Sequence, residues 1–327
     1  MLKFPSMQKI NMTLDNIKEE IESANKIVIL THESPDGDAV GSSLAMYNAL
    51  KQLNKDVDLI IPEYPETFSF LTGAEEIKKE TDIKNYDLAI SLDAADIKRL
   101  NGFAKYFEDA KVTINIDHHG SNKMFADYNF VNPDAPACCQ ILILVLEFLK
   151  VNITKEIGTC LLTGIITDTG GFKYSGTSKE TFEFTSWLLS IGVNVADVYR
   201  RVLEIRTKGN FELTKLAINR LELLENGKIA FTYITKEDEE KVNAKNGDHD
   251  GLVDIGRTIE GVEVSILLRE ADGFFKGSLR SNEYVNVSDV CMMFGGGGHI
   301  RAAGCSIHLP LKEAKEKIIN EVKNHLK

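Results

Sequence analysis

Four segments of the chain carry histidine and aspartate side chains of the kind that bind divalent cations. The first segment reads THESPDGD, and its His32, Asp36 and Asp38 place one imidazole and two carboxylates within seven residues. Imidazole nitrogen and carboxylate oxygen are common ligands of divalent cations. Gly37 between the two aspartates permits a tight turn that points both carboxylates inward. The alternative for this loop is that Asp38 caps the following helix.

The other three segments place the same residue types at the ends of apolar runs. Asp93 follows DLAISL, Asp117-His118-His119 follows KVTINI, and Asp168 follows the apolar run from Cys160 to Thr167. The alternative for Asp93 is a cap of the next helix, and the alternative for Asp117-His118-His119, a weak signal by itself, is a chance polar loop. Their repetition indicates a shared site.

Strands and helices alternate along this part of the chain, which predicts how the four segments are brought together. The apolar runs 26–30, 56–61, 87–92 and 111–116 predict buried strands, and helical patterns at 11–26, 39–53 and 137–150 accompany them. This alternation predicts an α/β fold with a parallel sheet and right-handed crossovers. Because parallel strands end at one edge of the sheet, three of the four clusters are expected to converge there.

The candidate ligands number six: His32, Asp36, Asp38, Asp93, His118 and Asp168. Six are too many for one structural zinc ion, which takes four and favours sulfur or nitrogen. They suit two oxygen-preferring ions, about 3.5–4 Å apart, that activate a water and stabilise the leaving oxygen of a phosphoester. Mixed imidazole and carboxylate ligation favours Mn²⁺, with Mg²⁺ or Co²⁺ as alternatives.

From Lys228 onward the pattern changes to a smaller mixed α/β domain. Residues 229–234, 262–270 and 273–280 predict strands, with helices at 235–243 and 252–259. We therefore expect a first domain at 1–195, a helical linker at 196–227 and a second domain at 228–327.

A glycine-rich segment near the end of the second domain predicts an anion site. It runs from Gly295 through Gly296, Gly297, Gly298 and His299 to Arg301. Consecutive glycines free the backbone to wrap an anion, and the two cationic side chains supply charge. Arg280 is a second expected anion contact, and a flexible loop is the alternative for the glycines. We expect the active cleft to lie between the two domains.

Composition limits the partners of this protein. The net charge is −11, from 38 basic and 49 acidic residues, which argues against binding long nucleic acid. The five cysteines include no CxxC, which argues against a disulfide framework and a zinc knuckle. The N-terminal residues lack the apolar core of a signal peptide, and no apolar run reaches membrane-spanning length. We therefore expect a cytoplasmic protein without a membrane partner.

The motifs HESPDGDA, LDAAD, DHH and TDTGG, followed by GGGGHIRAAG, resemble the DHH phosphoesterase superfamily with its DHH-associated C-terminal domain. Within it, the whole chain is similar to the nanoRNase/pAp phosphatase (NrnA-like) group. The resemblance implies that His32 and Asp36 bind one metal ion, that Asp38, His118 and Asp168 bind the other, and that Asp93 bridges them. It also implies that His119 lies near the scissile phosphate and that Asp117 orients it.

The same resemblance implies the substrates. Ser278, Arg280, Gly297, His299 and Arg301 match the substrate-holding motifs, with Gly296 and Gly298 beside them. The group removes 5′-mononucleotides from very short RNA and hydrolyses pApA or 3′-phosphoadenosine 5′-phosphate. Homodimers that form through the first domain are common in the family. A cyclic-di-AMP phosphodiesterase and a catalytically inactive nucleotide-binding regulator stay open as alternatives. The roles of Arg99, Tyr174 and the Cys138-Cys139 pair are not assigned.

Overall fold

The computed structural model describes residues 9–10, 13–245 and 247–327. The chain divides into two compact units, Met1–Ile205 and Arg206–Lys327. Residues 1–8, part of the stretch for which we predict no signal peptide, lie outside the described residues. So do Asn11 and Met12 of the first expected helix. No helix in the described ranges is both long and apolar enough to cross a membrane.

The first unit is built on a six-stranded sheet in the order β1-β6-β5-β4-β2-β3. Strands β2 to β6 are parallel, as the alternating pattern predicts, and β1 joins the edge antiparallel to β6. The two strands that the sequence did not reveal, β1 and β6, are short, and short strands carry little periodic signal. The strands are β1 (Lys9–Ile10), β2 (Lys26–Leu30), β3 (Asp56–Ile60), β4 (Leu88–Leu92), β5 (Val112–Asp117) and β6 (Tyr128–Val131).

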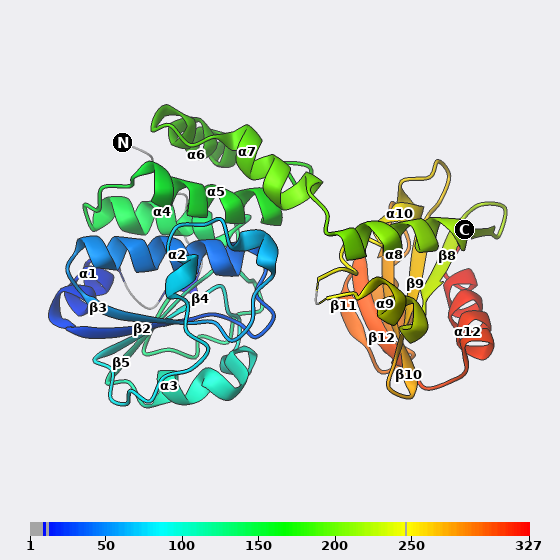
Figure 1. Ribbon diagram of the computed structural model, residues 1–327, viewed down its shortest axis with the longest axis horizontal. Coiled ribbons are helices and arrows are strands. Elements are labelled where there is room, and N and C mark those ends of the chain that lie inside the picture. The colour runs from blue at the N-terminus through cyan, green and yellow to red at the C-terminus, as the bar shows by residue number, and fades with distance from the viewer. Residues whose placement is uncertain (1–8, 11–12, 246) are drawn as a thin grey trace. The chain divides into compact units, whose positions relative to one another are not determined.

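Helices cover both faces of this sheet (Figure 1). Alternate residues of β2 enter different cores: Ile27 and Ile29 pack with the helices α1, α2, α4 and α5, whereas Val28 and Leu30 pack with residues of α3. This alternation follows from the two-residue period of a strand. The helices of the unit are α1 (Leu14–Ser23), α2 (Gly37–Gln52), α3 (Ala104–Glu108), α4 (Cys138–Phe148), α5 (Lys155–Asp168), α6 (Lys179–Ser190) and α7 (Val195–Tyr199).

Helices α2 and α5 approach each other closely because glycines line their contact. A Cβ atom on Gly41 would lie 2.5 Å from the carbonyl oxygen of Cys160, and one on Gly37 would lie 2.4 Å from Cγ2 of Thr167. The glycines thereby bring the first turn of α2 against the last turn of α5. Gly37 is the first residue of α2, so its lack of a side chain serves this approach and not the tight turn that we expected.

The segment 196–227, expected to be one helical linker, is not a single helix. After α7 comes a π-helical turn, η4 (Arg200–Glu204), and the backbone of Ile205 is extended. A separate helix, α8 (Lys208–Asn219), begins where the Thr207 hydroxyl accepts the amide of Asn210, and β7 (Glu222–Leu224) follows it. The Thr207 cap starts a new helix, which the uninterrupted apolar spacing of this region did not reveal.

The second unit has a mixed sheet in the order β11-β12-β10-β9-β8-β7, in which β8 and β9 are parallel and the other pairs antiparallel. One face packs against α11 and α12, and the other is covered over β8 and β9 by residues of α8 and of the segments 242–244 and 252–255. The remaining strands are β8 (Ile229–Ile234), β9 (Val264–Ala271), β10 (Phe274–Ser281), β11 (Gly297–His299) and β12 (Ala302–Ile307), and the helices are α9 (Lys236–Val242), α10 (Asp254–Arg257), α11 (Val287–Met292) and α12 (Leu311–Lys323).

Candidate metal centre

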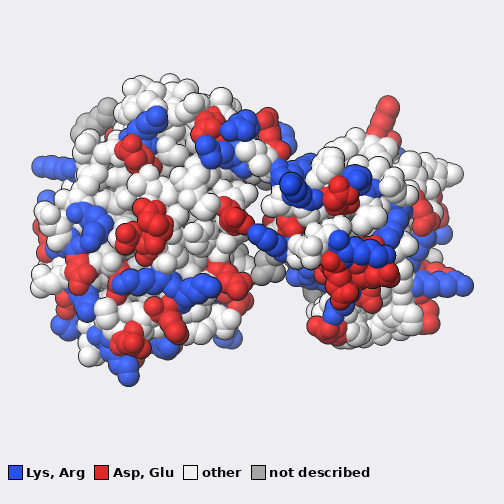
Figure 2. Space-filling model, viewed as in Figure 1, with Lys and Arg blue, Asp and Glu red and all other residues white. Residues whose placement is uncertain are grey.

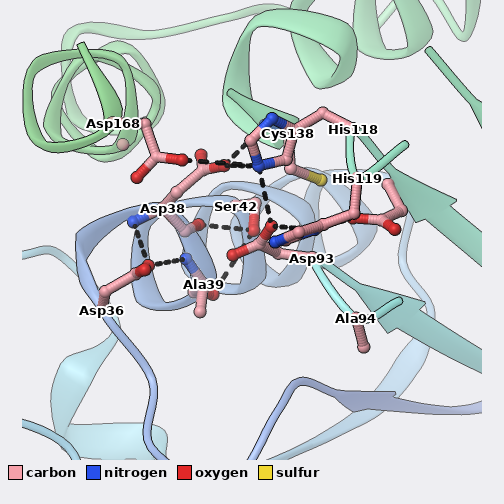
Figure 3. Close-up of polar contacts among 12 residues, drawn as sticks. Asp36, Asp38, Ala39, Ser42, Asp93, Ala94, His118, His119, Cys138 and Asp168 are labelled. Carbon is pink, nitrogen blue, oxygen red and sulfur yellow. Dashed lines mark hydrogen bonds and ion pairs between the residues drawn. The ribbon is translucent and has the colours of Figure 1, made fainter. Parts of the chain in front are cut away.

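The fold gathers all six candidate ligands at the carboxyl edge of the first sheet. His32 follows β2, Asp93 follows β4, His118 follows β5, and Asp168 is the last residue of α5. They form two groups whose ligand atoms lie within 4.8 Å of one another: His32 with Asp36 and Asp93, and Asp38 with His118 and Asp168. Figure 3 shows the carboxylates of Asp38, Asp93 and Asp168 around the His118 ring.

Asp36, and not Asp38, caps helix α2. The Asp36 carboxylate accepts the backbone amides of Asp38 and Ala39 at 3.0 and 3.1 Å. Asp38 lies inside the first turn, so the alternative that made it the cap is wrong. The cap fixes the backbone of this turn and leaves the Asp38 side chain free to turn into the protein.

The Asp38 carboxylate is completely buried and closes the N-terminus of a second helix, α4. It accepts the amides of Cys138 at 2.5 Å and Cys139 at 2.9 Å. Helix α4 has no side-chain cap from its own N-cap residue, Ala137, so Asp38 satisfies these two donors from a distant part of the sequence. The Cys138-Cys139 pair thus contributes backbone amides, and its thiols are free and buried.

Asp93 stands between the two groups. Its Oδ1 lies 3.3 Å from Nε2 of His118, and its Oδ2 lies 3.7 Å from Nε2 of His32. Its backbone is left-handed, with φ of 56°, a conformation that only a few residue types adopt readily. The left-handed turn comes directly after β4, where the Asp93 carboxylate lies within 4 Å of both His32 and His118.

Unpartnered buried atoms provide the test of whether these residues suit a cation. His118 Nδ1 donates to the Ala135 carbonyl at 3.2 Å, which leaves Nε2 with the lone pair that a metal ion needs. That Nε2 lies 3.4 Å from Asp168 Oδ2 and 3.8 Å from Asp38 Oδ2. In the described part of the chain, His118 Nε2, Asp93 Oδ1 and His32 Nδ1 are buried without hydrogen-bond partners. The donor set therefore fits divalent cations.

The electrostatics of the centre also favour added positive charge. Burial, with Asp93 next to it, raises the pKa of Asp38 to about 7. Burial and the charge of Asp38 also raise the pKa of Asp168 well above its ordinary value. Burial lowers the pKa of His118, but its carboxylate neighbours, Asp93 first, outweigh this and raise it to about 10. A cation that replaced the proton on His118 would relieve the repulsion among the neighbouring carboxylates in the same way.

Beside the two ligand groups lies His119, whose ring is fixed by a hydrogen bond with a buried aspartate. His119 Nδ1 contacts Asp117 Oδ1 at 2.7 Å, and the His119 side chain is 39% exposed while that of Asp117 is fully buried. The hydrogen bond with Asp117 raises the pKa of His119 against the opposing effect of burial. The sequence analysis missed Asn115 and Asn122, whose buried amides contact this region. The sequence offered one sign of their role, which is that Asn122 lies three residues after His119.

Four of the expected anion contacts of the second unit, Ser278, Arg280, Gly297 and His299, share one sheet face. Ser278 pairs with Gly304, and Gly304 pairs with Gly297. Arg280 and His299 both pair with Ala302 in the next row. Because directly paired residues point to the same face, the side chains of Arg280 and His299 lie on the same face as the small residues Ala302 and Gly304.

The glycine segment is more ordered than a flexible loop, the alternative that the sequence left open. Gly297 to His299 form β11, and a Cβ on Gly296 would lie 2.1 Å from the Gly304 carbonyl oxygen. The Arg301 guanidinium donates to the backbone carbonyls of Glu283 and Val285, so it stabilises a turn of its own unit. Its contact with a substrate stays a prediction.

Comparisons with known proteins agree with this geometry. The family model described as "DHH family, N-terminal domain" matches residues 26–165, and the "DHHA1 domain" model matches residues 226–327. A "Bifunctional oligoribonuclease and PAP phosphatase NrnA" from Thermus thermophilus is 34% identical over 302 residues, which cover 92% of this chain and 90% of the relative. The chain belongs to the DHH family.

Two further relatives of this DHH chain extend over nearly its full length. The bifunctional oligoribonuclease and PAP phosphatase NrnA of Bacillus subtilis is 26% identical over 86% of this chain and 89% of its own. The crystal structure of an exopolyphosphatase-related protein from Bacteroides fragilis superposes with a TM-score of 0.89 and 29% identity, covering 95% of both chains. The predicted family and α/β fold are therefore confirmed.

Proposed function

We propose that this DHH protein is a two-metal phosphodiesterase that hydrolyses short oligoribonucleotides and linear dinucleotides such as pApA to 5′-mononucleotides. We also propose that it removes phosphate from 3′-phosphoadenosine 5′-phosphate, in keeping with the names of its relatives. The observation that carries the proposal is the pair of three-residue ligand groups with Asp93 between them. Because all six ligand positions keep metal-binding residues, we do not favour an inactive regulator.

The two groups would hold one cation each. His32 and Asp36 would bind the first, Asp38, His118 and Asp168 the second, and Asp93 both. Mixed nitrogen and oxygen donors favour Mn²⁺, with Mg²⁺ or Co²⁺ as alternatives. Such a pair supplies an activated water and stabilises the charge that develops on the phosphoryl oxygens.

His119 is placed to move a proton. With Nδ1 donating to Asp117, Nε2 is the atom that can face the substrate, and in the metal-free protein the hydrogen bond with Asp117 raises the pKa of His119. In the proposed step, a water that has lost one proton to solvent forms a bond to phosphorus while the bond between phosphorus and the 3′-oxygen breaks. His119 Nε2 then gives its proton to the departing 3′-oxygen.

The second unit would bind the nucleotide. Arg280 and His299 stand over the small residues Gly304 and Ala302, so an anionic group can approach the backbone of β11 and β12 closely. Ser278, Gly296, Gly297 and Gly298 would add hydroxyl and backbone contacts. No base-specific side chain is part of this proposal, which suits a substrate defined by its short length.

Cytoplasmic location and a homodimer formed through the first unit complete the proposal. Support for the dimer comes from α6, where Phe182 and Leu189 lie seven residues apart on one helix face and are 55% and 52% exposed. Light scattering on the purified protein tests this part, since a monomer at micromolar concentration would contradict it.

The function is tested by product analysis with Mn²⁺, and with chelator as the control. pApA, an RNA pentamer, cyclic di-AMP and 3′-phosphoadenosine 5′-phosphate are compared side by side. We expect stepwise release of 5′-mononucleotides from pApA and the pentamer, and phosphate from the bisphosphate. Turnover of the bisphosphate alone would make this a monoesterase, and no turnover with metal bound would favour the inactive regulator.

A further inference from the structure

A buried asparagine lies behind the Asp117–His119 pair. Asn122 is 6% exposed, and its Nδ2 donates to Asp117 Oδ2 at 2.6 Å and to Asn115 Oδ1 at 2.8 Å. Its Oδ1 accepts the amide of Met124 at 2.7 Å. Both ends of the Asn122 amide are thus fixed, and one of them is fixed to the carboxylate that holds His119.

The two oxygens of Asp117 have different partners. Oδ1 meets His119 Nδ1 at 2.7 Å, and Oδ2 accepts from Asn122. Rotation of an aspartate carboxylate about its last bond meets only a broad, shallow barrier. A contact on Oδ1 alone would therefore leave the direction of the carboxylate loosely defined, whereas contacts on both oxygens define it.

We propose that Asn122 is a positioning residue: by holding Oδ2 of Asp117, it keeps Oδ1 on His119 Nδ1 and so directs His119 Nε2 toward the leaving oxygen. This inference rests on the proposed function only for the identity of that oxygen. Asn122 acts through Asp117 and His119 and touches no substrate.

A second asparagine separates this role from metal binding. Asn115 Nδ2 donates to the Ala94 carbonyl at 3.1 Å, next to the left-handed turn of Asp93. Asn122 contacts the same carbonyl at 3.3 Å. When Asn122 is replaced, Asn115 loses its contact with Asn122 but keeps its own hydrogen bond to this carbonyl. We therefore expect the ligand groups to keep their geometry while the Asp117 carboxylate loses one of its two anchors.

The kinetic test compares Asn122→Ala with Asn129→Ala. Asn129 is also a fully buried asparagine, and its side chain contacts the backbone of Ala126. We expect Asn122→Ala to lower kcat about 10- to 100-fold with KM and Mn²⁺ affinity unchanged, the usual size of such a loss. Asn129→Ala should leave kcat unchanged. Asn122→Ser, which keeps a hydroxyl for the Met124 amide, replaces the alanine variant if that variant does not fold.

A double-mutant cycle distinguishes positioning from a general structural effect. In a His119→Gln background, Asn122→Ala should cause no further loss of kcat, because the residue through which it acts is gone. Additive losses, a rise in KM alone, or an equal loss in Asn129→Ala would overturn the proposal.

A measurement without turnover keeps this test separate from that of the proposed function. In the Mg²⁺-loaded protein, the proton on His119 Nδ1 is identified by NMR as the downfield resonance absent from His119→Gln. We expect Asn122→Ala to lose or shift this resonance and Asn129→Ala to keep it. An unchanged resonance in Asn122→Ala refutes the positioning role. A wild-type protein that has this resonance but hydrolyses no nucleotide refutes only the proposed function.

Discussion

Gly164→Ala should disable the metal centre without changing any ligand. Gly164 lies in α5, where that helix meets the first turn of α2, and an added Cβ would lie 2.3 Å from Asp38 Oδ1 and 2.9 Å from Asp38 Cα. It would also lie 2.4 Å from Sγ of Cys139. The methyl group therefore meets the buried carboxylate that closes α4 and contributes to the second ligand group.

The distances set the size of the effect. Ordinary contact begins near 3.4 Å, so the Asp38 oxygen would have to move by about 1 Å, whereas metal ligands tolerate about 0.2 Å. Overpacking of this kind costs about 1–3 kcal/mol of folding free energy, which a domain stable by about 5–15 kcal/mol survives. A 1 Å misplacement at an active site lowers activity about 100-fold. We expect a folded protein with at least this loss.

Gly158→Ala is the matched control on the same helix. Its Cβ would lie 2.7 Å from Cγ2 of Val193 and 3.2 Å from Cδ2 of Leu188, side chains that pack away from the ligand groups. Both variants are compared by thermal unfolding, by Mn²⁺ titration and by hydrolysis of pApA. A Gly164→Ala protein with normal Mn²⁺ affinity and activity, or a Gly158→Ala protein with the same activity loss, would refute the reasoning.

Three further predictions follow from the centre. Asp93→Ala should lose both cations and turnover while the fold is retained, measured by metal analysis and circular dichroism; wild-type activity would contradict the two-metal arrangement. His119→Gln should keep Mn²⁺ affinity but lower kcat about 10²- to 10⁴-fold, as for loss of a general acid; an unchanged kcat would remove His119 from the chemistry. Because the pKa values of Asp38 and Asp168 are raised above the unfolded value of 3.8, these two groups stabilise the metal-free protein at low pH and lose that contribution as pH rises toward about 7. Added Mn²⁺ should therefore raise Tm more at about pH 8 than at about pH 5.5, and a pH-independent rise would contradict this electrostatic account.

The sequence predicted that the candidate ligands gather at one place because their signal is local. Apolar runs that end in His32, Asp93 or His118 define strand ends, and parallel strands place those ends at one edge. Three strands of the second unit, β8, β9 and β10, were also predicted, since their sequences have clear strand patterns. The elements that the sequence did not predict were short or interrupted, such as β6 and the break at Ile205. Too few residues there show the hydrophobic periodicity of a strand or a helix.

What the sequence by itself determined was therefore the α/β class, the family and the set of metal-binding residue types, all encoded in short segments. Only the tertiary structure decided which partners these residues have. Asp38 closes α4 a hundred positions away, a Cβ on Gly164 would meet the Asp38 carboxylate, and Asn115 reaches the Ala94 carbonyl on the neighbouring strand's loop. The physical reason is that such contacts depend on how closely helices and loops pack, and that distance is set by many side chains together, not by a local pattern.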